Sequence, residues 1–352
     1  MIKINNKIIG KNNPCFIVFE IGPTHNGFKS AKKLIKQAKI AGADAVKFQM
    51  IDADKLVQDK KQLFEYKILV DKKKNKFKSI KEPLYKILKR RELTKNQFKK
   101  LKKYCDQINI CFFSTASFNE EIDFLKSIGC DTIKIASADV NHFPLLEKAA
   151  KSKMCVQIDT GLATIDEISL AKKHMSKYSN KIIIHHCPPG YPSKHKDVNL
   201  NILKTLKKKF NCPIAFSDHT PGYNVDIAAL AFGVNLLEKT ITENKMTKSV
   251  EHSMSLEFDE MCDFVKSIRE IEESFGVHYK KLNDIEKENR KKIRRSIFLA
   301  QDVKKGQKLK NILVNFRRPG TGVSVELYEN LKNKIFTKDL KQGYKIKVSD
   351  LN

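Results

Sequence analysis

The chain has 352 residues, of which 41% are apolar and 31% charged; this excludes a disordered protein and predicts about two globular domains. No apolar run approaches the ~18 residues that a membrane-spanning helix needs, so we expect no membrane partner. The net charge is +28, but only eight of the 68 basic residues are arginines; because base recognition depends on arginine, we expect this charge to attract small anionic substrates and not nucleic acid.

Eight short apolar runs alternate with helix-like segments between residue 16 and about residue 275. The runs are continuous, which is typical of strands buried on both faces of a parallel sheet. In the first intervening segment Ala31, Leu34 and Ala38 recur at helical spacing, and Gly42 follows where a C-cap glycine would lie. Eight strand–helix repeats predict an α/β protein with a closed (β/α)8 TIM barrel. The expected strands lie at 16–20, 45–49, 110–114, 132–137, 155–159, 181–186, 213–217 and 235–239.

Two insertions and a change of texture complete the expected organisation. Residues 51–93 predict a long lysine-rich loop and helix after the second strand, and residues 188–197 a proline-broken loop after the sixth. From residue 294 onward the chain reads as short strands joined by glycine turns. We therefore expect a barrel domain at 1–280, a linker at 281–293 and a small β-rich domain at 294–352.

The N-terminal segment and the cysteines indicate the cellular compartment of the protein. The N-terminal segment lacks the long apolar core of a signal peptide. The eight cysteines are scattered singly, with no Cys-x-x-Cys pair, which argues against a zinc ribbon. Both features predict a protein of the reducing cytoplasm.

Polar residues end nearly every expected strand, where TIM barrels place their active sites. Two of them, Lys47 and Lys134, are lysines inside apolar strands, and burying an unpaired ammonium is costly. Ringed by hydroxyls, they predict an anion site at which a phosphate or carboxylate supplies the missing countercharge.

The ordered motifs FEIGPTHNG, DAVKFQ, FFSTA, IKIASAD, TGLAT, HHCPPGYP, FSDHTPGY and FRRPGTG resemble the sialic acid synthase family over almost the whole chain. That family includes N-acetylneuraminate, legionaminate and pseudaminate synthases. Residues 294–352 are similar to its C-terminal antifreeze-like (SAF) domain. The resemblance implies a transferase that condenses phosphoenolpyruvate with a 2-acetamido sugar aldehyde and releases phosphate. It also implies a divalent metal, Mn²⁺ or Mg²⁺, and a domain-swapped homodimer.

The resemblance also implies roles for individual residues. Glu20 matches the carboxylate that handles protons, and Asp139 stands where the family has a glutamate. Gln49 and Tyr191 match positions that touch the acceptor sugar, and Arg318 matches an arginine that the small domain places in the partner's active site. The positions that hold phosphoenolpyruvate are matched by Lys47, Thr115, Lys134, Ser137 and Ser217.

The metal side departs from the family pattern. His219 matches a metal ligand, but the second expected histidine is Thr240, a poor ligand for the same metal. His252 is the candidate replacement; Glu251 and Glu238 are oxygen alternatives, although the place of Glu238 inside a strand suggests structural pairing. The other departures are Asp159 for a serine, Pro189 for an asparagine and Ser117 for an aromatic residue.

Two alternatives remain open from the residues alone. Lys134 could form a Schiff base with pyruvate in a metal-independent aldolase. The chain could also bind sugars without catalysis, although binding alone would not need Glu20, Lys47, Lys134 and His219 together.

Overall fold

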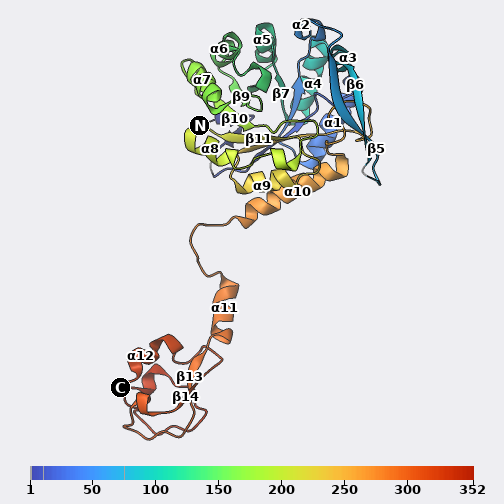
Figure 1. Cartoon of the computed structure of the whole chain (residues 1–352). Coiled ribbons are helices and arrows are strands. Elements are labelled where there is room, and N and C mark those ends of the chain that lie inside the picture. The colour runs from blue at the N-terminus through green and yellow to red at the C-terminus, as the bar shows by residue number, and fades with distance from the viewer. Residues whose placement is uncertain (1, 11, 75) are drawn as a thin grey trace. The chain divides into compact units, whose positions relative to one another are not determined.

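The computed structural model describes residues 2–10, 12–74 and 76–352 (Figure 1). The chain divides into two compact units after Phe275. A helix, α11 (Asp284–Ile293), occupies most of the segment that we expected as a linker. Within the described residues, no helix is both long and apolar enough to cross a bilayer.

The first unit is built on eight parallel strands that close into a barrel, with β12 paired to β3 to complete the ring. This confirms the predicted TIM barrel. The strands are β3 (Phe16–Glu20), β4 (Ala45–Gln49), β7 (Cys111–Thr115), β8 (Thr132–Ile135), β9 (Cys155–Asp159), β10 (Ile182–His186), β11 (Ile214–Asp218) and β12 (Leu236–Thr240).

Helices cover the outer face of the barrel (Figure 1). On α1 the predicted apolar positions Ala31, Leu34 and Ala38 are buried, and Gly42 ends the helix with a left-handed φ of 92°. Phe48 of β4 stacks on Phe112 of β7 at a centroid distance of 5.3 Å. The covering helices are α1 (Gly27–Ala41), α4 (Lys95–Gln107), α5 (Asn119–Ser127), α6 (Phe143–Lys151), α7 (Ile165–Ser176), α8 (Ile202–Lys209), α9 (Asn224–Ala231) and α10 (Phe258–Ser274).

An N-terminal hairpin, β1 (Ile2–Ile4) and β2 (Lys7–Ile9), packs against the inside of the barrel. Ile2, Ile4 and Ile9 share an apolar cluster with residues at the beginnings of the barrel strands, such as Phe16 and Ala45. Because all parallel strands begin at the same end of a barrel, this hairpin covers the N-terminal end of the barrel. The C-terminal ends of the strands lie at the opposite end.

The insertion after β4 differs from the prediction. Instead of a long loop and one helix, it contains α2 (Ala53–Leu56), the antiparallel hairpin of β5 (Leu63–Asp71) and β6 (Lys76–Pro83), and α3 (Leu84–Lys89). Tyr66 and Ile68 of β5 are buried. Lys67 of β5 and Lys76 and Lys78 of β6 are exposed beside buried or half-buried apolar residues, so the period-two pattern of a hairpin was present in the sequence. The high lysine content instead led to the prediction of a loop.

The second unit has its own small core, formed by residues such as Ile297, Leu309 and Phe336. Its strands β13 (Ser296–Leu299) and β14 (Val314–Arg317) are antiparallel, and α12 (Tyr328–Leu331) follows them. Arg318 comes directly after β14.

Candidate active site

A cavity of about 320 Å³ opens where the barrel strands end. Its wall combines strand ends and the loops that follow them with the insertion after β4. The strand ends contribute Glu20, Lys47, Gln49, Thr115, Asp159 and Glu238. The loops contribute Ser117, Ser137, Cys187, Tyr191, His219 and Glu251, among others. The insertion contributes Leu56, Phe64, Leu84, Ile87, Leu88 and Arg91. The cavity therefore has a polar floor and a mainly apolar side.

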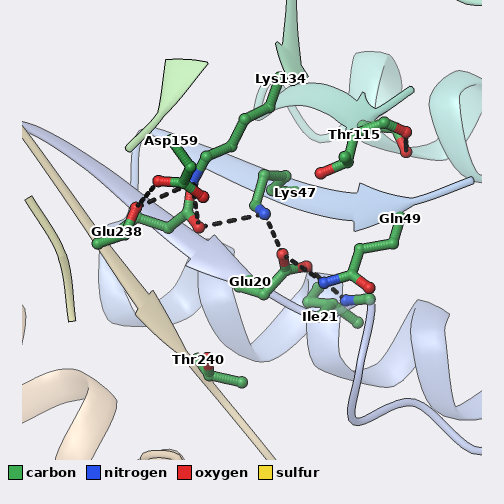
Figure 2. A network of polar contacts seen from close by, with 12 residues as sticks. Glu20, Ile21, Lys47, Gln49, Thr115, Lys134, Asp159, Glu238 and Thr240 are labelled. Carbon is green, nitrogen blue, oxygen red and sulfur yellow. Dashed lines mark hydrogen bonds and ion pairs between the residues drawn. The ribbon is translucent and has the colours of Figure 1, made fainter. Parts of the chain in front are cut away.

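The two buried lysines are paired with protein carboxylates (Figure 2). Lys47 Nζ contacts Glu20 and lies 3.1 Å from Glu238 Oε1. Lys134 Nζ lies 2.8 Å from both oxygens of Glu238 and 2.8 Å from Asp159 Oδ2. This corrects our expectation that the lysines lack a countercharge. Glu238, which we expected to be structurally paired, joins both lysines.

The pKa values in this network follow from burial opposed by ion pairing. Burial raises the pKa of Glu20, although Lys47 opposes the shift. For Glu238 and Asp159 burial acts in the same direction, but the lysines outweigh it and lower the pKa of each carboxyl. Burial would lower the pKa of Lys47, but Glu20 and Glu238 raise it. Glu20 is thus the member of the network best suited to carry a proton.

A chain of polar side chains continues from Lys134 into the barrel. Lys134 Nζ donates to Ser217 Oγ at 2.9 Å, and Ser217 Oγ lies 2.8 Å from His185 Nδ1. His185 Nε2 lies 2.9 Å from Gln157 Oε1. Burial and the Lys134 charge lower the pKa of His185 to about 3, so the ring stays neutral. These contacts fix the position of the Lys134 ammonium.

Most of the residues predicted for substrate binding come together at the cavity. Gln49 Nε2 lies 3.4 Å from Glu20 Oε2, and Thr115 and Ser137 line the wall. Tyr191 packs on His219, with their ring centroids 4.6 Å apart. The tip of Lys134 and the hydroxyl of Ser217 lie behind this wall, bonded to Asp159.

Asp139 is only half-buried, at the end of a short 3-10 helix (Ser137–Asp139), and is not among the described residues that line the cavity. Its neighbour Ser137 does line it. Burial raises the pKa of Asp139.

His219 and His252, the two predicted metal ligands, have different surroundings. His219 lines the cavity, and its Nδ1 lies 3.8 Å from Cys187 Sγ. His252 Nδ1 lies 2.7 Å from Thr242 Oγ1 and its Nε2 lies 3.1 Å from an Arg91 nitrogen, so both ring nitrogens have partners. The structure does not bring His252 to the cavity wall formed by the described residues; its neighbour Glu251 lies there.

Glu251 is held above β12 in an unusual conformation. Its φ of 73° lies in the left-handed region that non-glycine residues rarely adopt. Thr240, which replaces the expected histidine, donates a hydrogen bond to Glu251 Oε2 at 3.3 Å. Burial and the neighbouring Glu20 raise the pKa of Glu251 to about 8.

The described residues around His219 do not form a preformed site for a divalent metal. Among the described residues, the one group of three acidic or metal-binding side chains with ligand atoms close together is Asp52, Asp54 and Glu92. These carboxylates lie in the insertion and already contact lysines such as Lys60 and Lys89. The residues present therefore do not form a closed metal centre.

The comparisons with known proteins decide the family. The model of the NeuB family matches residues 34–280. The chain is 34% identical to N,N'-diacetyllegionaminic acid synthase of Legionella pneumophila, over 97% of this chain and 96% of the relative. It belongs to the NeuB family.

Other members of the NeuB family agree in sequence and fold. The synthase of the same name from Campylobacter jejuni is 32% identical over 93% of this chain and 97% of its own length. The solved structure of a Leptospira borgpetersenii N-acetylneuraminic acid synthetase superposes with a TM-score of 0.71 at 30% identity, over 82% of this chain and 94% of that one. The sialic acid synthase resemblance is thus confirmed.

The NeuB match ends at residue 280, so the likeness of residues 294–352 to a SAF domain stays a prediction. Sequence reasoning missed the cavity residues of the insertion, of which Arg91 is the charged one. The signal was present, because Arg90 and Arg91 are two of only eight arginines in a lysine-rich chain.

Proposed function

We propose that this chain joins phosphoenolpyruvate to a 2-acetamido sugar aldehyde, forms a sialic-type nonulosonic acid and releases phosphate. The observation that carries the proposal is the buried pair Lys47 and Lys134 beneath the cavity of a NeuB-family barrel, with the Glu20 carboxylate against Lys47. The relatives named as legionaminic acid synthases support this class of product. We also propose a cytoplasmic location, which the eight free cysteines support.

The reaction is balanced without any oxidant or reductant. Carbon C3 of phosphoenolpyruvate bonds to the aldehyde carbon, whose oxygen takes up a proton and becomes a hydroxyl. Water adds to C2, and the bond between C2 and the bridging oxygen of the phosphate breaks, so that inorganic phosphate leaves and the water oxygen remains as a ketone. One proton of the water balances the proton taken up by the aldehyde oxygen, and the other leaves with the phosphate. Two proton transfers therefore need a group that can both give and take a proton.

Glu20 is our first candidate for that group. Gly22 N–H donates to Glu20 Oε1 at 2.7 Å, which leaves the other oxygen toward Lys47 and Gln49. Its raised pKa places the proton exchange nearer to neutral pH than for an exposed glutamate. Asp139, next to the cavity residue Ser137 in the same 3-10 turn, is the second candidate.

The anionic substrate would bind by exchange of countercharges. Lys47 and Lys134 now contact Glu20, Asp159 and Glu238, and the phosphate and carboxylate of phosphoenolpyruvate would replace part of those contacts. Thr115, Ser137 and Ser217 would donate hydroxyl hydrogen bonds. Positioning of the enol carbon by these groups supplies catalysis through proximity.

A divalent ion would find few protein ligands in this cavity. His219 offers an imidazole and Glu251 a carboxyl, and both line the cavity. The carboxyl of Glu251 suits Mn²⁺ or Mg²⁺, whereas an imidazole favours softer transition-metal ions. Substrate oxygens would have to complete such a site.

Gln49 and Tyr191 are our candidates for the acceptor sugar, and Arg318 is proposed to complete the site of a partner subunit in a domain-swapped homodimer. Mixing Arg318→Ala subunits with Glu20→Gln subunits tests this, because a heterodimer has one intact composite site. Recovery of activity is expected; its absence after proven subunit exchange contradicts the swapped site.

A substrate screen tests the proposed function. Purified protein, phosphoenolpyruvate and Mn²⁺ are incubated with several 2-acetamido sugars, and inorganic phosphate is measured. Sugar-dependent phosphate release is expected, and Glu20→Gln should abolish it while Glu120→Gln, in a surface ion pair with Lys55, should not. Phosphate release that is the same with and without every sugar would contradict the proposal.

The Schiff-base alternative fits the geometry poorly. A nucleophilic lysine must be a neutral amine, whereas Lys134 contacts two carboxylates and a hydroxyl. Borohydride reduction with pyruvate should therefore leave the mass of the protein unchanged.

A further inference from the structure

Two adjacent arginines after α3 differ in their electrostatic partners. Arg90 is exposed and forms a bidentate ion pair with Glu82, at 2.8 and 2.7 Å. Arg91 is only 6% exposed and lines the cavity. Within the described parts of the chain, no acidic side chain forms an ion pair with Arg91.

The contacts of Arg91 are to neutral groups. One terminal nitrogen donates to the His25 carbonyl oxygen at 2.5 Å, and the other lies 3.1 Å from His252 Nε2. Because arginine has no acceptor, His252 Nε2 accepts this hydrogen bond. Burial and the Arg91 charge hold the pKa of His25 at about 4 and that of His252 at about 3, so both rings are neutral. A guanidinium carries five N–H groups, and these two contacts leave donors free for a ligand.

An uncompensated buried charge is expensive. Charged side chains are almost never fully buried unless they are paired, because the lost hydration costs several kcal/mol. Burial, followed by repulsion from Arg90, lowers the pKa of Arg91 to about 10, although the nearby charges of Glu251 and Glu82 oppose this shift; Arg91 therefore stays charged at neutral pH. The floor of the same cavity is different, since Lys47 and Lys134 there are matched by Glu20, Asp159 and Glu238.

The residues around Arg91 also differ from those on the cavity floor. The insertion contributes Leu84, Ile87 and Leu88 to the same wall, so Arg91 is the charged group of a mainly apolar side. Low-dielectric surroundings increase the strength of an ion pair formed there. A ligand group of opposite charge would supply what the protein does not.

We propose that Arg91 is a binding residue for an oxyanion, a phosphate or carboxylate group, carried by a ligand that fills this cavity. The inference rests on the proposed function only for the identity of that ligand. If it is the acceptor, the sugar bears an anionic group away from its aldehyde; if it is phosphoenolpyruvate, Arg91 adds to the two lysines. In both cases the guanidinium offers the planar, bidentate geometry that oxyanions fit.

Binding measurements without turnover test the inference. Titration calorimetry is run separately with a 2-acetamido hexose, with the same sugar as its 6-phosphate, and with phosphoenolpyruvate, on the wild type, Arg91→Met, Arg91→Lys and Arg90→Met. We expect Arg91→Met to weaken binding of one of the two anions about tenfold to a hundredfold and to leave the neutral sugar unchanged. Arg91→Lys should keep part of the affinity, and Arg90→Met, the matched control, should behave like the wild type.

The anion whose affinity falls identifies the source of the oxyanion. Unchanged affinity of both anions in a folded Arg91→Met variant overturns the inference. Should that variant fail to fold, Arg91→Lys and the wild type decide: a sugar phosphate bound no more tightly than the sugar, together with unaltered phosphoenolpyruvate binding in Arg91→Lys, overturns it equally. Loss of anion binding in a protein that releases no phosphate with any sugar would contradict the proposed function and leave this inference standing.

Discussion

The floor and the side of the cavity differ in how their charged side chains are paired. On the floor, side chains from barrel strands form a closed network in which Lys47 and Lys134 meet Glu20, Asp159 and Glu238. On the side, the insertion presents apolar residues and Arg91, which forms no ion pair with the described residues. The barrel thus holds its reactive groups in place by pairing them with one another, whereas the insertion leaves Arg91 without an ion pair, available to the proposed ligand.

The largest effect is expected on the floor. Glu20→Gln should lower kcat by about 10²–10⁴ because it removes the proposed proton-transfer group while keeping the shape of the side chain. Steady-state phosphate release measures this, with Glu120→Gln as the control. A Glu20→Gln variant with wild-type kcat would exclude Glu20 from proton transfer.

The ion pairs of Lys134 on the cavity floor should also stabilise the fold. Lys134→Met leaves Asp159 and Glu238 buried with too little positive charge, so the free energy of unfolding should fall by about 3–5 kcal/mol. Lys102→Met, which breaks a pair with exposed Asp106, should cost about 1 kcal/mol or less. Urea unfolding measures both, and equal losses would show that the buried pairing has no special weight.

Asp159 should compete with the substrate for Lys134. Asp159→Ser removes that competing carboxylate, so the KM for phosphoenolpyruvate should fall about tenfold, the value of one charge-assisted contact. A raised KM would mean instead that Asp159 assists binding.

Asp159 should also make the stability of the protein depend on pH. Lys134 lowers the folded-state pKa of Asp159 below its ordinary value of 3.8, so the unfolded chain takes up the proton first. The stability that Asp159 contributes should therefore be complete above about pH 4 and be lost as the pH falls through the lowered pKa. Urea unfolding of wild type and Asp159→Asn between pH 3 and pH 7 checks this, and a difference that grows toward low pH would contradict it.

The smallest expected effect concerns the metal. Because both ring nitrogens of His252 already have partners, His252→Ala should leave Mn²⁺ affinity nearly unchanged, whereas His219→Ala should weaken it. Calorimetric titration with Mn²⁺ separates the two variants. A similar large loss in both would make His252 a ligand after all.

The sequence predicted the barrel because each strand is a local apolar run, and eight such runs that alternate with helices are enough to close one sheet. It also predicted most of the residues around the cavity, since polar residues at strand ends must meet at one end of a barrel. It did not predict the pairing of Lys47 and Lys134 with Glu238, because cross-barrel contacts depend on side-chain direction and register. The hairpin of the insertion was not predicted because its high lysine content was taken as typical of a loop. The burial of Arg91 was not predicted because it depends on how the insertion packs over the barrel, which local sequence does not show.

The stoichiometry and the mass of the product test the proposed condensation. The protein is incubated with phosphoenolpyruvate and an accepted 2-acetamido sugar, and consumed phosphoenolpyruvate, released phosphate and product mass are measured together. We predict one phosphate per phosphoenolpyruvate and a product whose mass equals sugar plus phosphoenolpyruvate plus water minus phosphoric acid. Consumption of phosphoenolpyruvate that yields pyruvate and unchanged sugar would contradict the account.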